Sequence, residues 1–341
     1  MAIISGYFTG ESYGLLGPQM AATIIQNNTT YECIVIGVTR VDDRAVLKRA
    51  LEEYFGSQRP VVAFSALNGR EELFSLAREF REQGVFTMLA GPQANFDYMG
   101  EIGWHNHSHR FQGLDAHFTC SLHGPAEQVL HVLHGLDRDE WHTTQGLLYR
   151  GGDGRLIQNP KKTWDEQYLG KAQWDTLYRI GAGGLVPLAI TAGQVLQQIG
   201  CPYAARKRCI EIDYPVAMPG NSRVRLLLRG CSFCDVAVDK GFYGQLDMDT
   251  VIAQIQCLPR GPDGRKIPFE LINENPLPTL SGLLREVKEK GIGISQINLI
   301  LRADWLVKGH EMLREALRMA REIGVCLLLS SVGFESFDNG Q

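Results

Sequence analysis

The sequence predicts an α/β protein, with a doubly wound, Rossmann-like parallel sheet in its N-terminal part and a second series of strands and helices after it. Two observations predict this fold class. Short, β-rich apolar runs alternate with amphipathic helical patterns over the first 135 residues, and a similar alternation begins near residue 221. We expect a first domain over residues 1–142, a hairpin and connecting region over 143–220, and a second domain over 221–341.

The composition is that of an ordinary globular protein. The chain has 341 residues, enough for two domains of about 150 residues each. Hydrophobic residues make up 44%, charged residues 21%, and the net charge is -4, so neither a disordered tail nor a nucleic-acid partner is expected. Apolar windows of about 18 residues and a basic, apolar leader are missing, so we expect no membrane span and a cytoplasmic location. There the 8 cysteines should stay reduced.

Five apolar runs in the first domain have the length and composition of buried parallel strands. Helical patterns separate them. One begins at Asp42 and Asp43 and stops at Gly56, and another stops at Gly84. This alternation is typical of repeated βαβ units. The expected strands cover residues 2–8, 33–39, 61–67, 86–91 and 117–122.

Small residues and glycines follow three of these strands. An open parallel sheet binds ligands beyond the carboxyl ends of its strands, so these loops are the candidate binding site. A single glycine can simply turn the chain, whereas three such loops at one edge favour a ligand site. The candidates are Ser65, Ala66, Leu67, Asn68 and Gly69 after the third strand, Gly91, Pro92 and Gln93 after the fourth, and Gly124 and Glu127 after the fifth.

The stretches SALNGREE, LAGPQA and HFTCSLHGPAEQVLHVL, in this order, resemble the cobalamin-binding domain of radical S-adenosylmethionine (SAM) enzymes. The resemblance implies that the three loops surround the corrin ring of cobalamin. Residues 143–162, TTQGLLYRGGDGRLIQNPKK, are similar to the short hairpin that closes this domain, and their glycines also indicate a turn by themselves. The loop after the first strand, GYFTGESYGLLG, contains no histidine, so we expect no histidine below the cobalt.

Beyond residue 220, strand and helix patterns alternate again. Cys231 and Cys234 form a CxxC directly after the first strand of this series, which in a reducing compartment indicates a metal site or a redox pair. The sequence stops just after the fourth strand, so we expect a parallel edge that further chain or an oligomer partner covers. The expected strands are 224–228, 267–273, 295–301 and 325–331, and the expected helices are 248–258, 279–291 and 310–324.

Four pieces of this second series, RGCSFC, NENP, LILRADW and GFES, resemble the partial (β/α) barrel of radical SAM enzymes. The resemblance implies a 4Fe-4S cluster on Cys231 and Cys234 and a third thiolate, which the family supplies from CxxxCxxC. Leu227 stands where that first cysteine would be expected, so Cys209 is the candidate third ligand. The implied SAM contacts are Phe233 and Glu335 at the adenosyl part and Asn273, Glu274 and Arg302 at the polar groups.

The resemblance as a whole implies an N-terminal doubly wound, Rossmann-like cobalamin-binding domain followed by a partial (β/α) radical SAM barrel. The implied function is that of a cobalamin-dependent radical SAM enzyme, with a 4Fe-4S cluster, SAM and cobalamin as cofactors. The expected reaction is methyl transfer or radical rearrangement on an unactivated carbon of a small-molecule or peptide substrate, with an external electron donor. Two alternatives stay open. One is a non-catalytic corrinoid-binding protein with a degenerate cluster site, and the other is a zinc or dithiol protein that uses only the CxxC.

Overall fold

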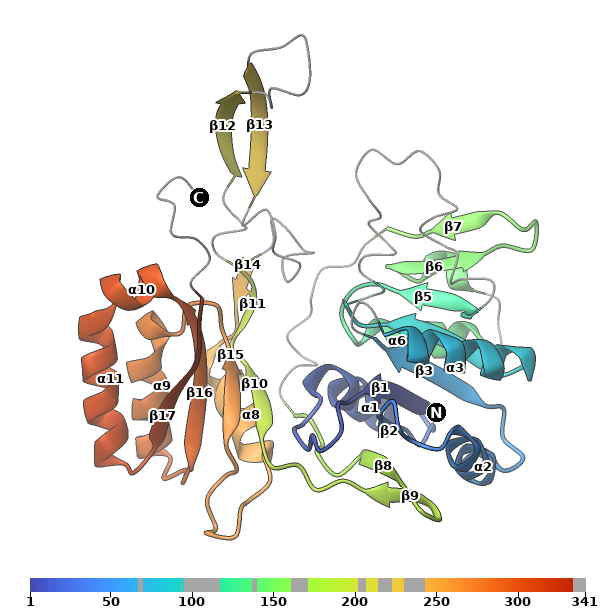
Figure 1. The fold of residues 1–341 in the computed structure, drawn as a ribbon, viewed down its shortest axis with the longest axis horizontal. Coiled ribbons are helices and arrows are strands. Elements are labelled where there is room, and N and C mark those ends of the chain that lie inside the picture. The colour runs from blue at the N-terminus through green and yellow to red at the C-terminus, as the bar shows by residue number, and fades with distance from the viewer. Residues whose placement is uncertain are drawn as a thin grey trace. The chain divides into compact units, whose positions relative to one another are not determined.

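The protein folds into two compact units, each with its own sheet and helices (Figure 1). The first unit comprises Met1–Gly193 with Cys257–Pro259, and the second comprises Gln194–Gln256 with Arg260–Gln341. The first unit extends well beyond residue 142, where the sequence analysis ends the first domain, because further strands join its sheet. The computed structural model describes residues 1–66, 70–92, 94, 117–136, 140–160, 171–201, 207–213, 223–229 and 243–333.

The first unit contains a nine-stranded sheet in the order β7-β6-β5-β4-β3-β1-β2-β8-β9. Its five predicted strands are β1 (Ala2–Gly6), β2 (Ile34–Val38), β3 (Val61–Ser65), β4 (Phe86–Ala90) and β5 (Cys120–Leu122). They run parallel, as expected. The chain passes from β1 to β2 on one side and continues through β3, β4 and β5 on the other. The carboxyl ends of β1 and β3 therefore flank the point where the winding reverses, which is the usual ligand position in such sheets.

The helices of this unit are α1 (Leu16–Asn28), α2 (Arg44–Phe55), α3 (Glu71–Glu82) and α6 (Gln128–Gly135), followed by the 3-10 turn η1 (Trp141–Thr143). α2 and α3 cover one face of the sheet. Side chains alternate along a strand, so Ile4, Phe64 and Leu89 share this face and pack with the buried residues of both helices. α2 begins at the predicted signal, because the carboxylate of Asp43 accepts a hydrogen bond from Ala45 N at 2.8 Å.

α1 and α6 contact each other and lie on the opposite face of the sheet. On this face the strands present Ile3, Ala63 and Met88, all buried. Several of the facing side chains are small, among them Ala63 on β3 and Ala90 at the end of β4. Small side chains fill less of the space between a sheet and its covering helices, and this face contains a cavity as a result.

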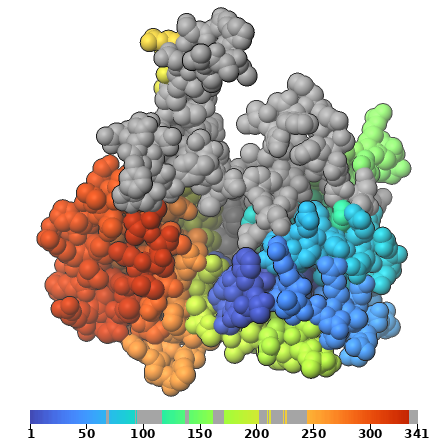
Figure 2. Space-filling view, viewed as in Figure 1, coloured from blue at the N-terminus to red at the C-terminus, as the bar shows by residue number. Residues whose placement is uncertain are grey.

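Two hairpins extend the sheet at its edges. β6 (Leu147–Arg150) pairs antiparallel with β5 and with β7 (Leu156–Gln158), which confirms the hairpin predicted over residues 143–162. β8 (Leu177–Gly181) pairs parallel with β2 and antiparallel with β9 (Gly184–Pro187). The sequence analysis placed this second hairpin in a connecting region. It forms part of the exposed surface of the first unit, coloured yellow-green in Figure 2.

The second unit contains a four-stranded sheet, β10-β15-β16-β17, made of β10 (Gly193–Leu196), β15 (Phe269–Ile272), β16 (Gln296–Arg302) and β17 (Cys326–Gly333). The last three strands are parallel and match predicted strands. The prediction for residues 224–228 is wrong in its pairing. They lie in β13 (Arg223–Arg229), which pairs antiparallel with β12 (Lys207–Asp213) in a separate sheet.

β10 pairs with β15 in this sheet and is also held by a helix. Gln254, buried on α8 (Met248–Cys257), accepts a hydrogen bond from Leu196 N at 2.9 Å and donates one to Leu196 O at 2.8 Å. Val195, the residue before Leu196, is fully buried. The two partners are 58 residues apart, so no local pattern around residues 193–196 predicts their pairing.

α8, α9 (Leu277–Glu289) and α11 (His310–Glu322) stand on one side of the four-stranded sheet, and the short α10 (Ala303–Lys308) follows β16. The strand residues on the other side stay accessible, with Ile300 38% and Leu328 44% exposed. β17 is an edge strand, and the oligomer expected to cover this edge stays a prediction. Among the described helices, none has both the length and the apolar composition needed to cross a bilayer.

Candidate functional site

A cavity of about 240 Å³ lies in the first unit between the sheet and the helices α1 and α6. Strands β1, β3, β4 and β5 form its floor, and residues from all three predicted loops form part of its wall. The structure therefore brings Ser65, Gly91, Pro92 and Gly124 together around one space. The lining residues are Met1, Ile3, Gly17, Pro18, Ala21, Ala63, Ser65, Met88, Ala90, Gly91, Pro92, Leu122, Gly124, Pro125, Ala126 and Val129.

The glycines at the rim of the cavity are required by the backbone. Gly91 has φ +79°, and a β-carbon there would lie 2.9 Å from Ser65 Oγ and 3.3 Å from Ala66 N. Gly124 has φ +128°, a conformation that residues with a β-carbon rarely adopt. A β-carbon on Gly124 would meet no atom within 4 Å, so the space next to it is open. The rim therefore has no side chain at these two positions.

The floor of the cavity is apolar. Ile3, Met88 and Leu122 on the strands contribute aliphatic or thioether groups, and Val129 on α6 adds another from the helix side. Among the described lining residues, Ser65 is the one with a polar side chain. Such a surface offers a flat, largely apolar ligand dispersion contacts and a single hydroxyl.

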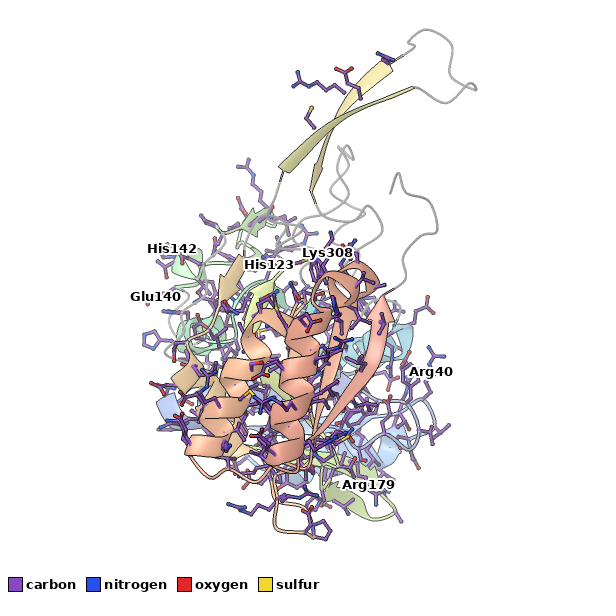
Figure 3. The ribbon with its side chains drawn as sticks, turned by 90° about the vertical axis from the view of Figure 1, so that its left-hand side faces the viewer. Arg40, His123, Glu140, His142, Arg179 and Lys308 are labelled. Atoms are coloured by element: carbon purple, nitrogen blue, oxygen red, sulfur yellow. The ribbon has the colours of Figure 1, made fainter. Side chains whose placement is uncertain are left out.

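Two predicted loop residues do not line the cavity. Ala66 is 1% exposed, and its backbone N donates to Ala90 O at 3.2 Å, which joins the ends of β3 and β4. Glu127 is 2% exposed and directly precedes α6. His123, labelled in Figure 3, is likewise buried, and its backbone N donates to Gly146 O at 2.9 Å. Their positions indicate that they fix the loops around the cavity.

Sequence reasoning missed the contribution of α1. Gly17, Pro18 and Ala21 lie in its first two turns and line the cavity beside β1. The signal was present in the run GLLGPQMAA, where a proline at the third helical position and nearby small residues indicate a helix start that can approach a ligand closely. The loop before it was searched only for a metal-binding histidine.

Arg70 is a second residue that sequence reasoning missed. It directly follows residues 65–69, the predicted loop after the third strand, and is 7% exposed. Nη2 donates to Tyr7 O at 3.3 Å, and a β-carbon on Gly6 would lie 2.3 Å from this guanidinium. Nε donates to the carboxylate of Glu72, which also lies 3.5 Å from Nε of Arg40, a residue labelled in Figure 3. Arg70 thus places a buried cation at the carboxyl end of β1, where the winding reverses.

In the second unit, Asn273 and Glu274 follow β15. Asn273 is 5% exposed, donates from Nδ2 to Gln197 Oε1 at 2.7 Å, and accepts from Asn275 N at 2.8 Å. Its amide therefore shapes the turn after the strand. Burial, together with the negative charge of Glu270, raises the pKa of Glu274 above its ordinary value. A carboxylate held at such a cost is typical of a functional position.

Arg302 ends β16, the parallel neighbour of β15, so it lies at the same edge of the sheet as Asn273. Its Nε lies 2.9 Å from Asp304 Oδ1, and its guanidinium carbon lies 5.6 Å from the centre of the Trp305 ring. The side chain is 25% exposed. Arg302 thus has a local ion pair and a cation-π contact while part of it stays accessible.

Cys209 lies on β12 opposite Leu227, and its exposed thiol accepts a hydrogen bond from Arg225 Nε at 2.8 Å. Within the described ranges, no three His, Cys, Asp or Glu residues are grouped closely enough to hold a metal ion. The remaining predicted site residues lie outside the described residues: Leu67, Asn68, Gly69, Gln93, Cys231, Phe233, Cys234 and Glu335.

Comparison with defined protein families gives no match, and comparison with curated proteins gives none either. Solved structures do match. The chain superposes over 100% of its length on the cobalamin-dependent S-adenosylmethionine radical enzyme OxsB with aqua-cobalamin and S-adenosylmethionine bound, at a TM-score of 0.64 and 12% identity. The TM-scores are 0.61 for OxsB with aqua-cobalamin and 0.56 for apo, SeMet-labelled OxsB, both at 12% identity.

The matched region is 44% of the OxsB chain, so this chain spans less than half the length of that protein. At 12% identity the likeness establishes a shared α/β fold, and the chemistry has to be argued from the residues themselves.

Proposed function

We propose that the first unit binds a corrinoid and that the chain is the corrinoid-binding and SAM-binding part of a cobalamin-dependent radical SAM enzyme. One observation carries the proposal. Three loops predicted from the sequence as corrin contacts border a single apolar cavity at the carboxyl side of a doubly wound sheet. The shared fold with OxsB, described as binding aqua-cobalamin and S-adenosylmethionine, supports the same ligand class.

The size of the cavity limits which part of cobalamin it can hold. Pockets that enclose a whole drug-sized ligand measure about 300–1,000 Å³. The cavity, at about 240 Å³, lies below this range, so we assign it to a part of the ligand. A dry cavity of about 150 Å³ holds benzene, so a cavity of this size suits a two-ring aromatic base. Cobalamin carries such a base, dimethylbenzimidazole, on its nucleotide tail.

In this arrangement Gly91, Pro92 and Gly124, at the rim of the cavity, would contact the corrin ring. The absence of histidine ligation to cobalt stays a prediction from the sequence. Met88 and Val129 would contact the aromatic base of the tail, and the hydroxyl of Ser65 would donate to a ring nitrogen of that base.

In the second unit, we propose the following contacts with SAM and with a 4Fe-4S cluster. Asn273, Glu274 and Arg302 would meet the polar groups of SAM at the edge where β15 and β16 end, with Phe233 and Glu335 at the adenosyl part. Cys231, Cys234 and Cys209 would hold the 4Fe-4S cluster. When bound, cobalamin supplies a transferable methyl group, and the cluster with SAM supplies a 5'-deoxyadenosyl radical. Methyl transfer or radical rearrangement on a small molecule or peptide, with an external electron donor, is the proposed reaction class.

The full chain, purified anaerobically, tests this proposal. Equilibrium dialysis against hydroxocobalamin should show retention, and after reconstitution metal analysis should find cobalt and iron together. Cobalt without iron would favour the non-catalytic corrinoid-binding alternative. Zinc without cobalt would favour the zinc alternative, and no retention of any corrinoid would overturn the proposal.

A further inference from the structure

We infer that the cavity of the first unit selects among corrinoids by their lower base, accepting a benzimidazole and rejecting a purine such as adenine. The inference rests on the proposed corrinoid function and specifies the ligand of that same site. Corrinoids share the corrin ring and differ in the aromatic base of the nucleotide tail. A cavity that encloses the base can therefore distinguish between them.

The first step is the chemistry of the lining. Among the sixteen lining residues that the structure describes, twelve have apolar side chains, three are glycines, and Ser65 is the one with a polar side chain. Dimethylbenzimidazole has two methyl groups and, once off the cobalt, a single free ring nitrogen. One hydroxyl can satisfy that nitrogen, and the methyl groups suit aliphatic and thioether neighbours such as Ile3 and Met88.

The second step concerns the backbone of the strands that form the floor. Its amides and carbonyls already bond to neighbouring strands. β3 pairs with β1 and β4 along its whole length, from Val61 to Ser65 in the ladder with β4. Beyond the strand, Ala66 N donates to Ala90 O at 3.2 Å. Strand amides and carbonyls that bond to each other are not available to a ligand placed on the face of the sheet.

The third step is the cost of a purine in this space. Adenine has an exocyclic amino group and several ring nitrogens, and the one hydroxyl among the described lining side chains cannot satisfy them all. A buried polar group left without a partner weakens binding by about ten- to a hundredfold. Sites that lack matching polar groups therefore discriminate strongly against a ligand that needs them.

The test compares three corrinoids on the full chain by equilibrium dialysis: hydroxocobalamin, its analogue with adenine as lower base, and cobinamide, which has no base. We expect hydroxocobalamin to bind at least tenfold more tightly than either of the others, a difference of about 1.4 kcal/mol. Equal dissociation constants for the two tailed corrinoids would overturn the inference while leaving the corrinoid function intact. Failure to bind all three would instead overturn the proposed function.

A larger side chain in the cavity, compared with the same substitution on the other face of the sheet, gives a second test. Ala21 lies on α1 and lines the cavity, whereas Ala45 lies exposed on α2, which covers the other face of the sheet. Leucine is a good helix former, so both Ala21→Leu and Ala45→Leu should fold. Ala21→Leu should weaken hydroxocobalamin at least tenfold and leave cobinamide unchanged, and Ala45→Leu should change neither.

The converse variant makes the wall of the cavity more polar. Val129→Asn places an amide in the cavity and should narrow the preference for hydroxocobalamin over the adenine corrinoid by at least threefold. Unaltered binding of hydroxocobalamin by Ala21→Leu, or an equal loss for cobinamide, would show that the cavity does not hold the base and would overturn the inference.

Discussion

Gly91 and Ser65 approach so closely at the ends of β4 and β3 that a β-carbon on Gly91 would lie 2.9 Å from Ser65 Oγ. Ser65 also pairs with Ala90 in the strand ladder. A hydrogen bond from Ala66 N to Ala90 O at 3.2 Å joins the two strand ends beside the cavity. Gly91 is required for two reasons. Its φ of +79° disfavours residues with a β-carbon, and Ser65 leaves no room for a side chain.

We predict that Gly91→Ala weakens hydroxocobalamin binding and destabilises the protein. Gly84→Ala is the matched control, because Gly84 also has φ +79° but has no atom within 4 Å of a β-carbon. The backbone conformation costs about 1–2 kcal/mol in both variants. The clash with Ser65 adds to this in Gly91→Ala alone. Urea unfolding measures the stability, and equilibrium dialysis measures hydroxocobalamin binding. Equal stability and equal affinity in the two variants would contradict the prediction.

Glu274 should make the stability of the second unit depend on pH. Its pKa is raised in the folded protein, mainly by burial and then by Glu270, so the folded state retains the proton above the usual pKa of 4.5. The stabilisation by the protonated form is complete below pH 4.5 and is lost as pH rises through the folded pKa. Glu274→Gln, which imitates that form, should therefore raise stability relative to wild type at pH 7 but not at pH 4.

Urea unfolding at the two pH values measures this effect. Glu53→Gln, which removes an exposed charge on α2 of the other unit, controls for net charge. If Glu274 also meets SAM, Glu274→Gln should weaken SAM binding while it stabilises the fold. A stabilised variant with unchanged SAM affinity would assign Glu274 no part in that site.

Variants of the ion pair between Arg302 and Asp304 distinguish a structural role of Arg302 from a role in SAM binding. The pair is partly exposed, and such pairs contribute about 0.2–1 kcal/mol. We expect Arg302→Gln and Asp304→Asn to lower stability by similar small amounts. Only Arg302→Gln should weaken SAM binding, by about tenfold or more, in isothermal titration with the reconstituted protein. Equal SAM affinity in both variants would leave Arg302 a structural residue.

The cluster ligands can be tested one thiol at a time. We predict that Cys231→Ala and Cys234→Ala abolish cluster reconstitution and that Cys209→Ala reduces it. Iron content and the reduced-cluster resonance, with and without SAM, provide the measurement. Cys33→Ser is the control, because Cys33 is fully buried and burial raises the pKa of its thiol to about 12. A complete cluster in Cys209→Ala would exclude that thiol as the third ligand.

The alternation of strands and helices was readable from the sequence. Strands buried on both faces leave continuous apolar runs, and helix ends carry local signals such as Asp43, so β1 to β5 and the β6–β7 hairpin follow from short-range patterns. The rim loops could be found in the same way, because parallel strands place their carboxyl ends at one edge and glycines mark where the chain turns there.

Which strands pair, and what lies between sheet and helices, was decided by the tertiary structure. A period-two pattern does not identify a strand's neighbour, so the sequence analysis placed residues 224–228 in the wrong sheet. The weak segment 193–196 pairs with β15 in the second unit instead, and Gln254 holds it from α8. The cavity arises because Ala21, Ala63 and Ala90 come from three separate elements onto one face. Small residues leave a usable space only when distant segments pack around them, and that packing is set by contacts far apart in the chain.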